Sequence, residues 1–104
     1  MNDDFGLRQS DIDTIVLILS AYSKVNQAIL FGSRAKGNYR NGSDVDIAIK
    51  TEELSFEQLS EISVRLNEDT CLPYKFDVLI YETIVNAELL DHINRIGICF
   101  YKKS

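Results

Sequence analysis

The chain has 104 residues, 45% of them hydrophobic, and a formal net charge of −5, which predicts a single domain over residues 1–104 with one hydrophobic core. The acidic balance argues against binding of a long nucleic acid, because such proteins carry a basic stripe that neutralises phosphates. No apolar run approaches the roughly 20 residues of a membrane span, and the acidic start does not resemble a signal peptide, so we expect a cytoplasmic protein without a membrane partner.

A helix and a strand are expected in the first third of the chain. Apolar residues at helical spacing predict a helix over 10–22, with Ser10 as its N-cap and Asp13 as the acid of an approximate capping box. Residues 28–31 are a short apolar run that predicts a buried strand. A short helix or turn over 33–37 is expected to follow it.

The middle of the chain predicts a turn and then a strand whose two faces differ. Asn41-Gly42-Ser43 is a strong turn sequence, and residues 44–50 alternate strictly after it. Side chains of a strand point alternately to its two faces. One face would therefore carry Val45, Ile47 and Ile49, and the other Asp44, Asp46 and Ala48.

The last part of the chain predicts two more helices and two more strands. Ser55 and Gln58 are placed for a capping box at the start of a helix. The apolar stripe of that helix is expected to be Phe56, Leu59, Ile62 and Leu66. A strand is then expected over 75–81, a helix over 82–95 and a short strand over 98–101.

This order of elements predicts an α/β (α+β) domain, a small mixed β-sheet flanked by helices. Only about a dozen residues join the strands at 28–31 and 44–50, a link short enough for antiparallel pairing. The one histidine, His92, lies in the last expected helix and is interpreted as an ordinary helix residue. A zinc site or a histidine acid–base pair is therefore not expected.

Three aspartates are the candidates for metal binding. Asp44 and Asp46 point to one face of their strand, where their mutual repulsion needs an offset that Mg²⁺, which prefers hard oxygen ligands, provides. Asp77 stands alone among apolar neighbours in the later strand. If the two strands are adjacent, the three carboxylates can hold two Mg²⁺ ions about 3.5–4 Å apart, and Asp77 can also accept the proton of an attacking hydroxyl.

Gly32, Ser33 and Arg34 are the candidates for binding the phosphates of ATP. Glycine lets the backbone approach a phosphate without a Cβ in the way, and serine offers an N–H and a hydroxyl. Arg34, or less favourably Lys36 or Arg40, can neutralise triphosphate charge. Each of these features alone also has an ordinary structural interpretation. However, Gly-Ser followed after ten residues by Asp-x-Asp arises by chance in a chain of this length roughly once in a thousand.

With Gly32-Ser33, the ten-residue spacer, Asp44-Val45-Asp46 and Asp77 in a later strand, the chain resembles the DNA polymerase β-like nucleotidyltransferase superfamily. More narrowly, the stretch FGSRAKGNYRNGSDVDIAI resembles the minimal nucleotidyltransferases of bacteria and archaea. The resemblance implies the nucleotidyltransferase core fold, metal ligation by the three aspartates, and phosphate contacts from Gly32-Ser33.

The same resemblance implies a partner. Minimal nucleotidyltransferases are typically paired with a small helical HEPN protein, an RNase toxin, and act as antitoxin by adding AMP to a toxin tyrosine. The residues leave two alternatives open. One is a non-catalytic antitoxin that neutralises its partner by docking, and the other is a transferase for a small molecule such as an aminoglycoside, which the short chain disfavours.

Overall fold

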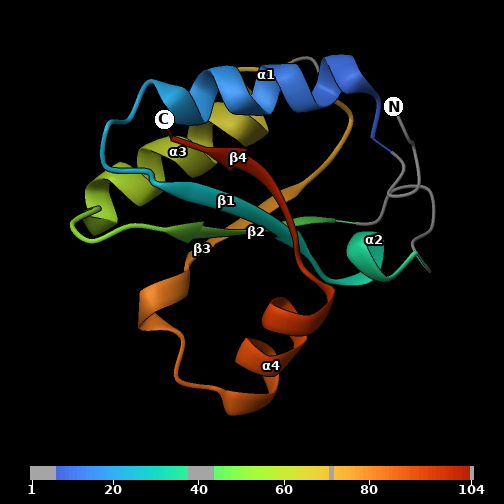
Figure 1. The fold of residues 1–104 in the computed structure, drawn as a ribbon. Helices are drawn as coiled ribbons and strands as arrows, with labels where there is room; N and C mark the ends of the chain where they lie inside the picture. The colour runs from blue at the N-terminus through green and yellow to red at the C-terminus, as the bar shows by residue number, and fades with distance from the viewer. Residues whose placement is uncertain (1–6, 38–43, 71, 104) are drawn as a thin grey trace.

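The computed structural model describes residues 7–37, 44–70 and 72–103. Its strands form a single sheet, and its helices pack against that sheet (Figure 1). In chain order they are α1 (Gln9–Ser20), β1 (Gln27–Phe31), α2 (Ser33–Lys36), β2 (Val45–Lys50), α3 (Phe56–Glu68), β3 (Phe76–Ile80), a 3₁₀ turn (Tyr81–Thr83), α4 (Ala87–Ile96) and β4 (Ile98–Lys102). Within those described ranges, no helix is both long and apolar enough to cross a membrane.

The sheet is mixed, with the strand order β3-β2-β1-β4. β1 is antiparallel to both of its neighbours, and β2 is parallel to β3. The predicted antiparallel pairing of the first two strands is therefore confirmed. The predicted turn at 41–43 lies outside the described residues, and the strand after it begins at Val45, so that Asp44 immediately precedes it.

Helices cover the two faces of the sheet unequally (Figure 1). α1 and α3 lie together on one face, where their apolar residues pack against Val45, Ile47 and Ile49 in the larger core. α4 lies on the other face, where Ile93 packs in a smaller cluster with Ala48 and the β1 residues Ile29 and Phe31. The predicted alternation along β2 is thus confirmed, because its odd-numbered residues all enter the larger core.

The start of α1 differs from the prediction. The helix begins two residues earlier than Ser10 would set it, with Arg8 as N-cap, and the Asp11 carboxylate accepts a hydrogen bond from the Arg8 N–H at 3.1 Å. Leu7, just before the cap, and Ile12, four residues into the helix, are both buried in the larger core. Such a hydrophobic staple fixes the direction of chain entry, and it overrides the capping tendency of Ser10.

α3 begins as predicted but uses a narrower apolar stripe. The Gln58 N–H donates to Ser55 Oγ at 3.1 Å and the Ser55 N–H donates to Gln58 Oε1 at 3.3 Å, which confirms the capping box. Ile62 and Leu66 are fully buried. Phe56, however, is 77% exposed, because the first residue of the helix lies beyond the edge of the core.

α4 begins five residues later than predicted. Residues 81–83 form a 3₁₀ turn, Ile84 is extended, and Asn86 caps the helix by accepting the Leu89 N–H at 2.9 Å. The β-branched run Thr83-Ile84-Val85 disfavours helix, and asparagine competes strongly for the N-cap position. The end of the helix at Ile96, just before Gly97, and the short strand that follows are close to the prediction.

The outer edge of β3 is held by a side chain of α3. Asn67 accepts the Phe76 N–H at 2.8 Å and donates to the Phe76 carbonyl oxygen at 3.1 Å. On the inner side, the Val45 N–H donates to the carbonyl oxygen of Lys75 at 2.8 Å. Asn67 thus pairs with Phe76 in the way a further strand would, and it joins the start of β3 to α3.

Candidate active site

Two of the predicted carboxylates lie side by side on neighbouring strands. In the parallel pairing of β2 with β3, Asp46 is registered with Asp77. Both belong to the sheet face that also carries Ala48, which is the face of α4 rather than that of α1 and α3. Asp46 is partly buried and Asp77 is exposed. The structure therefore brings this predicted pair together at a place open to solvent.

Asp44 interacts with Asp46 electrostatically. It is exposed, immediately before β2. Burial, and then the negative charges of Asp77 and Asp44, raise the pKa of Asp46 above its usual value. Burial is the largest of these causes, and the two neighbouring carboxylates add a repulsion that a bound cation would relieve.

The donor set has the chemistry that Mg²⁺ requires, since carboxylate oxygens are its preferred protein ligands. Among residues 7–37, 44–70 and 72–103, no three His, Cys, Asp or Glu side chains lie close enough together to hold a metal ion. Asp44, Asp46 and Asp77 supply oxygen donors of the kind that this cation prefers, and ligation of one ion by all three stays a prediction.

Gly32 has a conformation and a contact that both require glycine. Its φ of 80° and ψ of −155° lie in a region that other residues rarely adopt. A Cβ built at this position would also collide with the carboxylate of Asp46. The sequence pattern predicts a close approach between Gly32 and a phosphate, and the structure adds a close approach between Gly32 and Asp46.

Ser33 directly follows this glycine as the first residue of α2, and it is partly exposed. The Gly37 N–H donates to the Ser33 carbonyl oxygen at 3.0 Å and ends the turn, with Gly37 in the left-handed conformation at φ 86°. The confirmed short helix therefore places Ser33 at the end of β1 beside the Asp46 strand.

Arg34, the third candidate phosphate ligand, points into the protein. It is only 3% exposed, and its guanidinium carbon lies 5.0 Å from the centre of the Tyr74 ring. The Tyr74 hydroxyl in turn donates to Asp11 Oδ2 at 2.9 Å. Arg34 thus ties α2 to the segment before β3 and, through Tyr74, to α1. Phosphate binding by Arg34 stays a prediction. Arg40, a less favoured candidate for the same role, lies outside the described residues.

His92 belongs to the site, which the sequence interpretation missed. Its Nε2 accepts a hydrogen bond from the Gly32 N–H at 2.9 Å, and its ring meets the Phe31 ring edge-on with the centroids 6.2 Å apart. The two partners are sixty positions apart in the sequence, so local patterns do not reveal this contact. The apolar residues Leu89 and Ile93, four apart, indicate which side of this helix faces the sheet, but they do not reveal that His92 lies beside Gly32.

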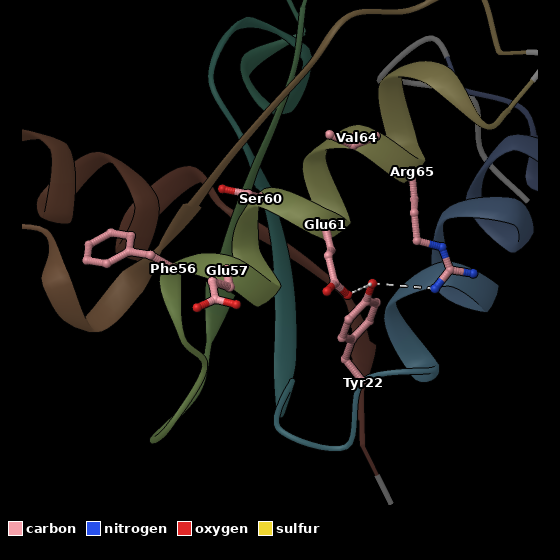
Figure 2. Close-up of a pocket in the computed structure, with 7 residues that line it drawn as sticks. All are labelled: Tyr22, Phe56, Glu57, Ser60, Glu61, Val64 and Arg65. Atoms are coloured by element: carbon pink, nitrogen blue, oxygen red, sulfur yellow. Dashed lines mark hydrogen bonds between the residues drawn. The ribbon is translucent and has the colours of Figure 1, made fainter.

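A separate hollow lies on α3 (Figure 2). Tyr22 and the α3 residues Phe56, Glu57, Ser60, Glu61, Val64 and Arg65 line it. Its only hydrogen bonds drawn in the figure join Tyr22 to Glu61, at 3.1 Å, and to Arg65, at 3.5 Å. Since α3 covers the other face of the sheet, this hollow is not part of the carboxylate site.

A comparison with protein families decides the general assignment. Residues 13–104 match the model of the family described as polymerase beta, nucleotidyltransferase. The chain belongs to this nucleotidyltransferase family. The resemblance predicted from the Gly-Ser and Asp-x-Asp spacing is therefore confirmed, and with it the mixed-sheet fold class.

Relatives of this nucleotidyltransferase domain are found among curated proteins and solved structures. A Methanocaldococcus jannaschii protein named for an inferred protein adenylyltransferase activity is 29% identical over 94 residues, which cover 86% of this chain and 88% of that protein. A toxin–antitoxin structure with AMP-PNP matches at a TM-score of 0.74, with 21% identity over 89% of this chain and 74% of that one. A complex of tri-AMPylated Shewanella oneidensis HEPN toxin with MNT antitoxin matches at 0.71, with 19% identity over 93% and 74%. At these identities the two solved structures establish the shared fold.

Proposed function

We propose that the chain is a Mg²⁺-dependent nucleotidyltransferase that uses ATP to transfer AMP to a hydroxyl of a HEPN-type helical protein, a tyrosine hydroxyl, and thereby acts as its antitoxin. The observation that carries the proposal is the register that sets Asp46 beside Asp77, with Gly32 packed against the Asp46 carboxylate. AMP as the transferred group is supported by the M. jannaschii relative. The partner is supported by the fold shared with a chain of the AMPylated toxin complex.

Each residue of the site has a proposed role. Asp44, Asp46 and Asp77 are the metal ligands, and two Mg²⁺ ions held there would supply stabilisation of the phosphate charge and of the attacking oxygen. Ser33 donates from its N–H and hydroxyl to phosphate oxygens, next to the Cβ-free backbone of Gly32. Arg34 is the least accessible member of the set, because it is buried against Tyr74.

The proposed transfer is a single displacement at the α-phosphorus of ATP. A bond forms between the tyrosine oxygen and that phosphorus, and the bond from the phosphorus to the oxygen that bridges the α- and β-phosphates breaks. Pyrophosphate leaves, and Asp77 takes the hydroxyl proton. Positioning and electrostatics do nearly all the catalytic work in such reactions, so a covalent nucleophile on the chain is not required.

Intact mass spectrometry tests the proposal directly. The purified chain is mixed with ATP, Mg²⁺ and a HEPN-type candidate partner protein, and both proteins are weighed. We expect the partner to gain the mass of one AMP residue or a multiple of it. The double variant Asp44→Asn with Asp46→Asn keeps the side-chain shapes and should abolish the gain. A partner of unchanged mass in a stable complex would overturn the enzymatic proposal in favour of the docking-only antitoxin.

A further inference from the structure

The peptide nitrogen of Gly32 lies at the junction of two elements. β1 ends at Phe31 and α2 begins at Ser33, so the Gly32 N–H falls between the strand and the helix. A backbone donor at such a place needs a partner from elsewhere. His92, sixty residues later on α4, supplies it with an acceptor nitrogen at 2.9 Å.

The conformation of Gly32 determines what lies on either side of it. Its positive φ turns the chain from β1 into α2, and the missing Cβ leaves the space that the Asp46 carboxylate occupies. Its carbonyl oxygen accepts the Lys36 N–H at 3.1 Å, which closes the single turn of α2. Gly32 thus determines where α2 begins with Ser33, and its backbone packs against the Asp46 carboxylate.

The imidazole of His92 is itself held in place. Its ring stands edge-on against Phe31. The next residue, Ile93, is 2% exposed in the smaller cluster between α4 and the sheet. An Nε2 that accepts a hydrogen bond carries no proton, so the proton of the neutral ring is on Nδ1. A side chain anchored by its neighbours in this way can hold a flexible glycine in one conformation.

We propose that His92 is a positioning residue of the nucleotidyl-transfer site, one that fixes the Gly32-Ser33 turn for the nucleotide phosphates through its bond to the Gly32 N–H. The inference rests on the proposed function, because it assumes that this turn meets a nucleotide. His92 acts through Gly32 and does not itself contact the substrate. Its loss should therefore weaken the binding of nucleotide more than it weakens the fold.

A matched pair of variants on α4 separates these two effects. His92→Leu removes the acceptor, whereas Asn94→Leu removes a different bond between the helix and the rest of the chain, that of the Tyr81 hydroxyl to Asn94 Oδ1 at 2.7 Å. With AMP-PNP and Mg²⁺ as the probe in isothermal titration calorimetry, we expect the dissociation constant to rise about tenfold for His92→Leu. Asn94→Leu should stay within about twofold of the wild type.

Two further variants replace the ring by an amide. Gln reaches about as far as Nε2 and can present an oxygen to the Gly32 N–H, whereas Asn is too short. We expect His92→Gln to restore binding to within about threefold of the wild type and His92→Asn to behave like His92→Leu. Hydrogen exchange of the Gly32 amide, followed by NMR without nucleotide, should be faster in the leucine and asparagine variants than in the glutamine variant.

Two results would overturn the inference. One is wild-type affinity for AMP-PNP in the folded His92→Leu or His92→Asn variant, and the other is unchanged exchange of the Gly32 amide in both. Failure of the proposed function gives a different pattern, in which the wild-type chain binds AMP-PNP but does not modify its partner. A wild-type chain that binds no nucleotide at all would remove both proposals.

Discussion

The two faces of the sheet divide the work of the molecule between them. On the face covered by α1 and α3, the β2 residues Val45, Ile47 and Ile49 are all completely buried. On the face of α4, the alternate residue Asp46 is partly exposed and carries a raised pKa. Because successive side chains of a strand point to opposite faces, one six-residue strand contributes to the stability of the fold and to the candidate chemistry without using any residue twice.

The comparison implies that stability and activity can be changed separately. Substitutions on the α1 and α3 face should lower the free energy of unfolding and leave the chemistry of the surviving folded molecules unchanged. Substitutions among the aspartates should lower the rate of AMP transfer without lowering the free energy of unfolding. The following substitutions test that division, from the largest expected effect to the smallest.

Ile47→Ala should have the largest effect, on stability. Ile47 is fully buried between the two helices and the sheet, and its truncation should lower the free energy of unfolding by about 2–5 kcal/mol. Urea denaturation measures this loss. AMP transfer per folded molecule should remain close to the wild type, and a large loss of that activity would show that the two faces are coupled.

Asp46→Asn and Asp77→Asn should have the next largest effect, on activity. Each removes one charge from the proposed metal site, and each should lower the initial rate of AMP transfer by about 10²–10³-fold. The free energy of unfolding should not fall in either variant. Rates within tenfold of the wild type would contradict the assignment of these two carboxylates to the chemistry.

Gly32→Ala should impair both properties, and Gly37→Ala is its matched control. Both glycines have positive φ, but a Cβ at Gly32 meets the Asp46 carboxylate while a Cβ at Gly37 has no neighbour within 4 Å. Backbone strain alone should cost about 1–2 kcal/mol at Gly37. Thermal unfolding should show a larger loss at Gly32, and only that variant should also lose AMP transfer. Equal effects of the two would contradict a specific contact with Asp46.

The charge of Asp46 should make a smaller contribution to stability, and one that depends on pH. Its pKa in the folded state is raised above the unfolded value of 3.8, first by burial and then by Asp77 and Asp44. The folded state therefore binds this proton more tightly, and the ionised group destabilises the fold at pH values above its folded pKa. Without Mg²⁺, Asp46→Asn should be more stable than the wild type at pH 7, and this difference should disappear as the pH falls through the folded pKa toward 3.8. An advantage that is constant with pH, measured by urea denaturation at several pH values, would contradict this.

Phe56→Ser should have the smallest effect. Phe56 is 77% exposed at the first position of α3, so its loss should change the free energy of unfolding by no more than about 0.5 kcal/mol. AMP transfer, measured with the purified chain, ATP, Mg²⁺ and the purified partner, should also be unchanged. A strong loss of transfer would mean that the hollow on α3 meets the partner, and the division between the two faces would then need revision.

The parts of the fold that could be predicted are those encoded locally. Alternation in β2, the capping box at Ser55 and the isolated Asp77 each lie within a few residues of chain, and the structure confirms the strands and the pairing that follow from them. The errors at Ser10 and Phe56 have a common cause. Capping tendency predicts Ser10 as the N-cap and apolar spacing predicts Phe56 in the core, whereas burial of Leu7 in one case and the limit of the core in the other decide the outcome.

The site could be predicted only where its residues share a motif. The contact of His92 with Gly32 joins segments sixty residues apart, and the inward direction of Arg34 depends on Tyr74, forty residues further along the chain. Neither contact leaves a periodic trace in the sequence. Such long-range contacts are set by the packing of α4 and of the segment before β3, which no local pattern describes.

The two hydrogen bonds between the Asn67 amide and the Phe76 backbone affect how one molecule can associate with another through its sheet edge. β3 is an edge of the sheet, and an open edge invites a strand from another chain to extend it. Because the Asn67 amide already occupies both outward-facing polar groups of Phe76, an incoming strand cannot begin to pair there without displacing it. The side chain that joins β3 to α3 therefore also opposes edge-to-edge association at the residue just before Asp77.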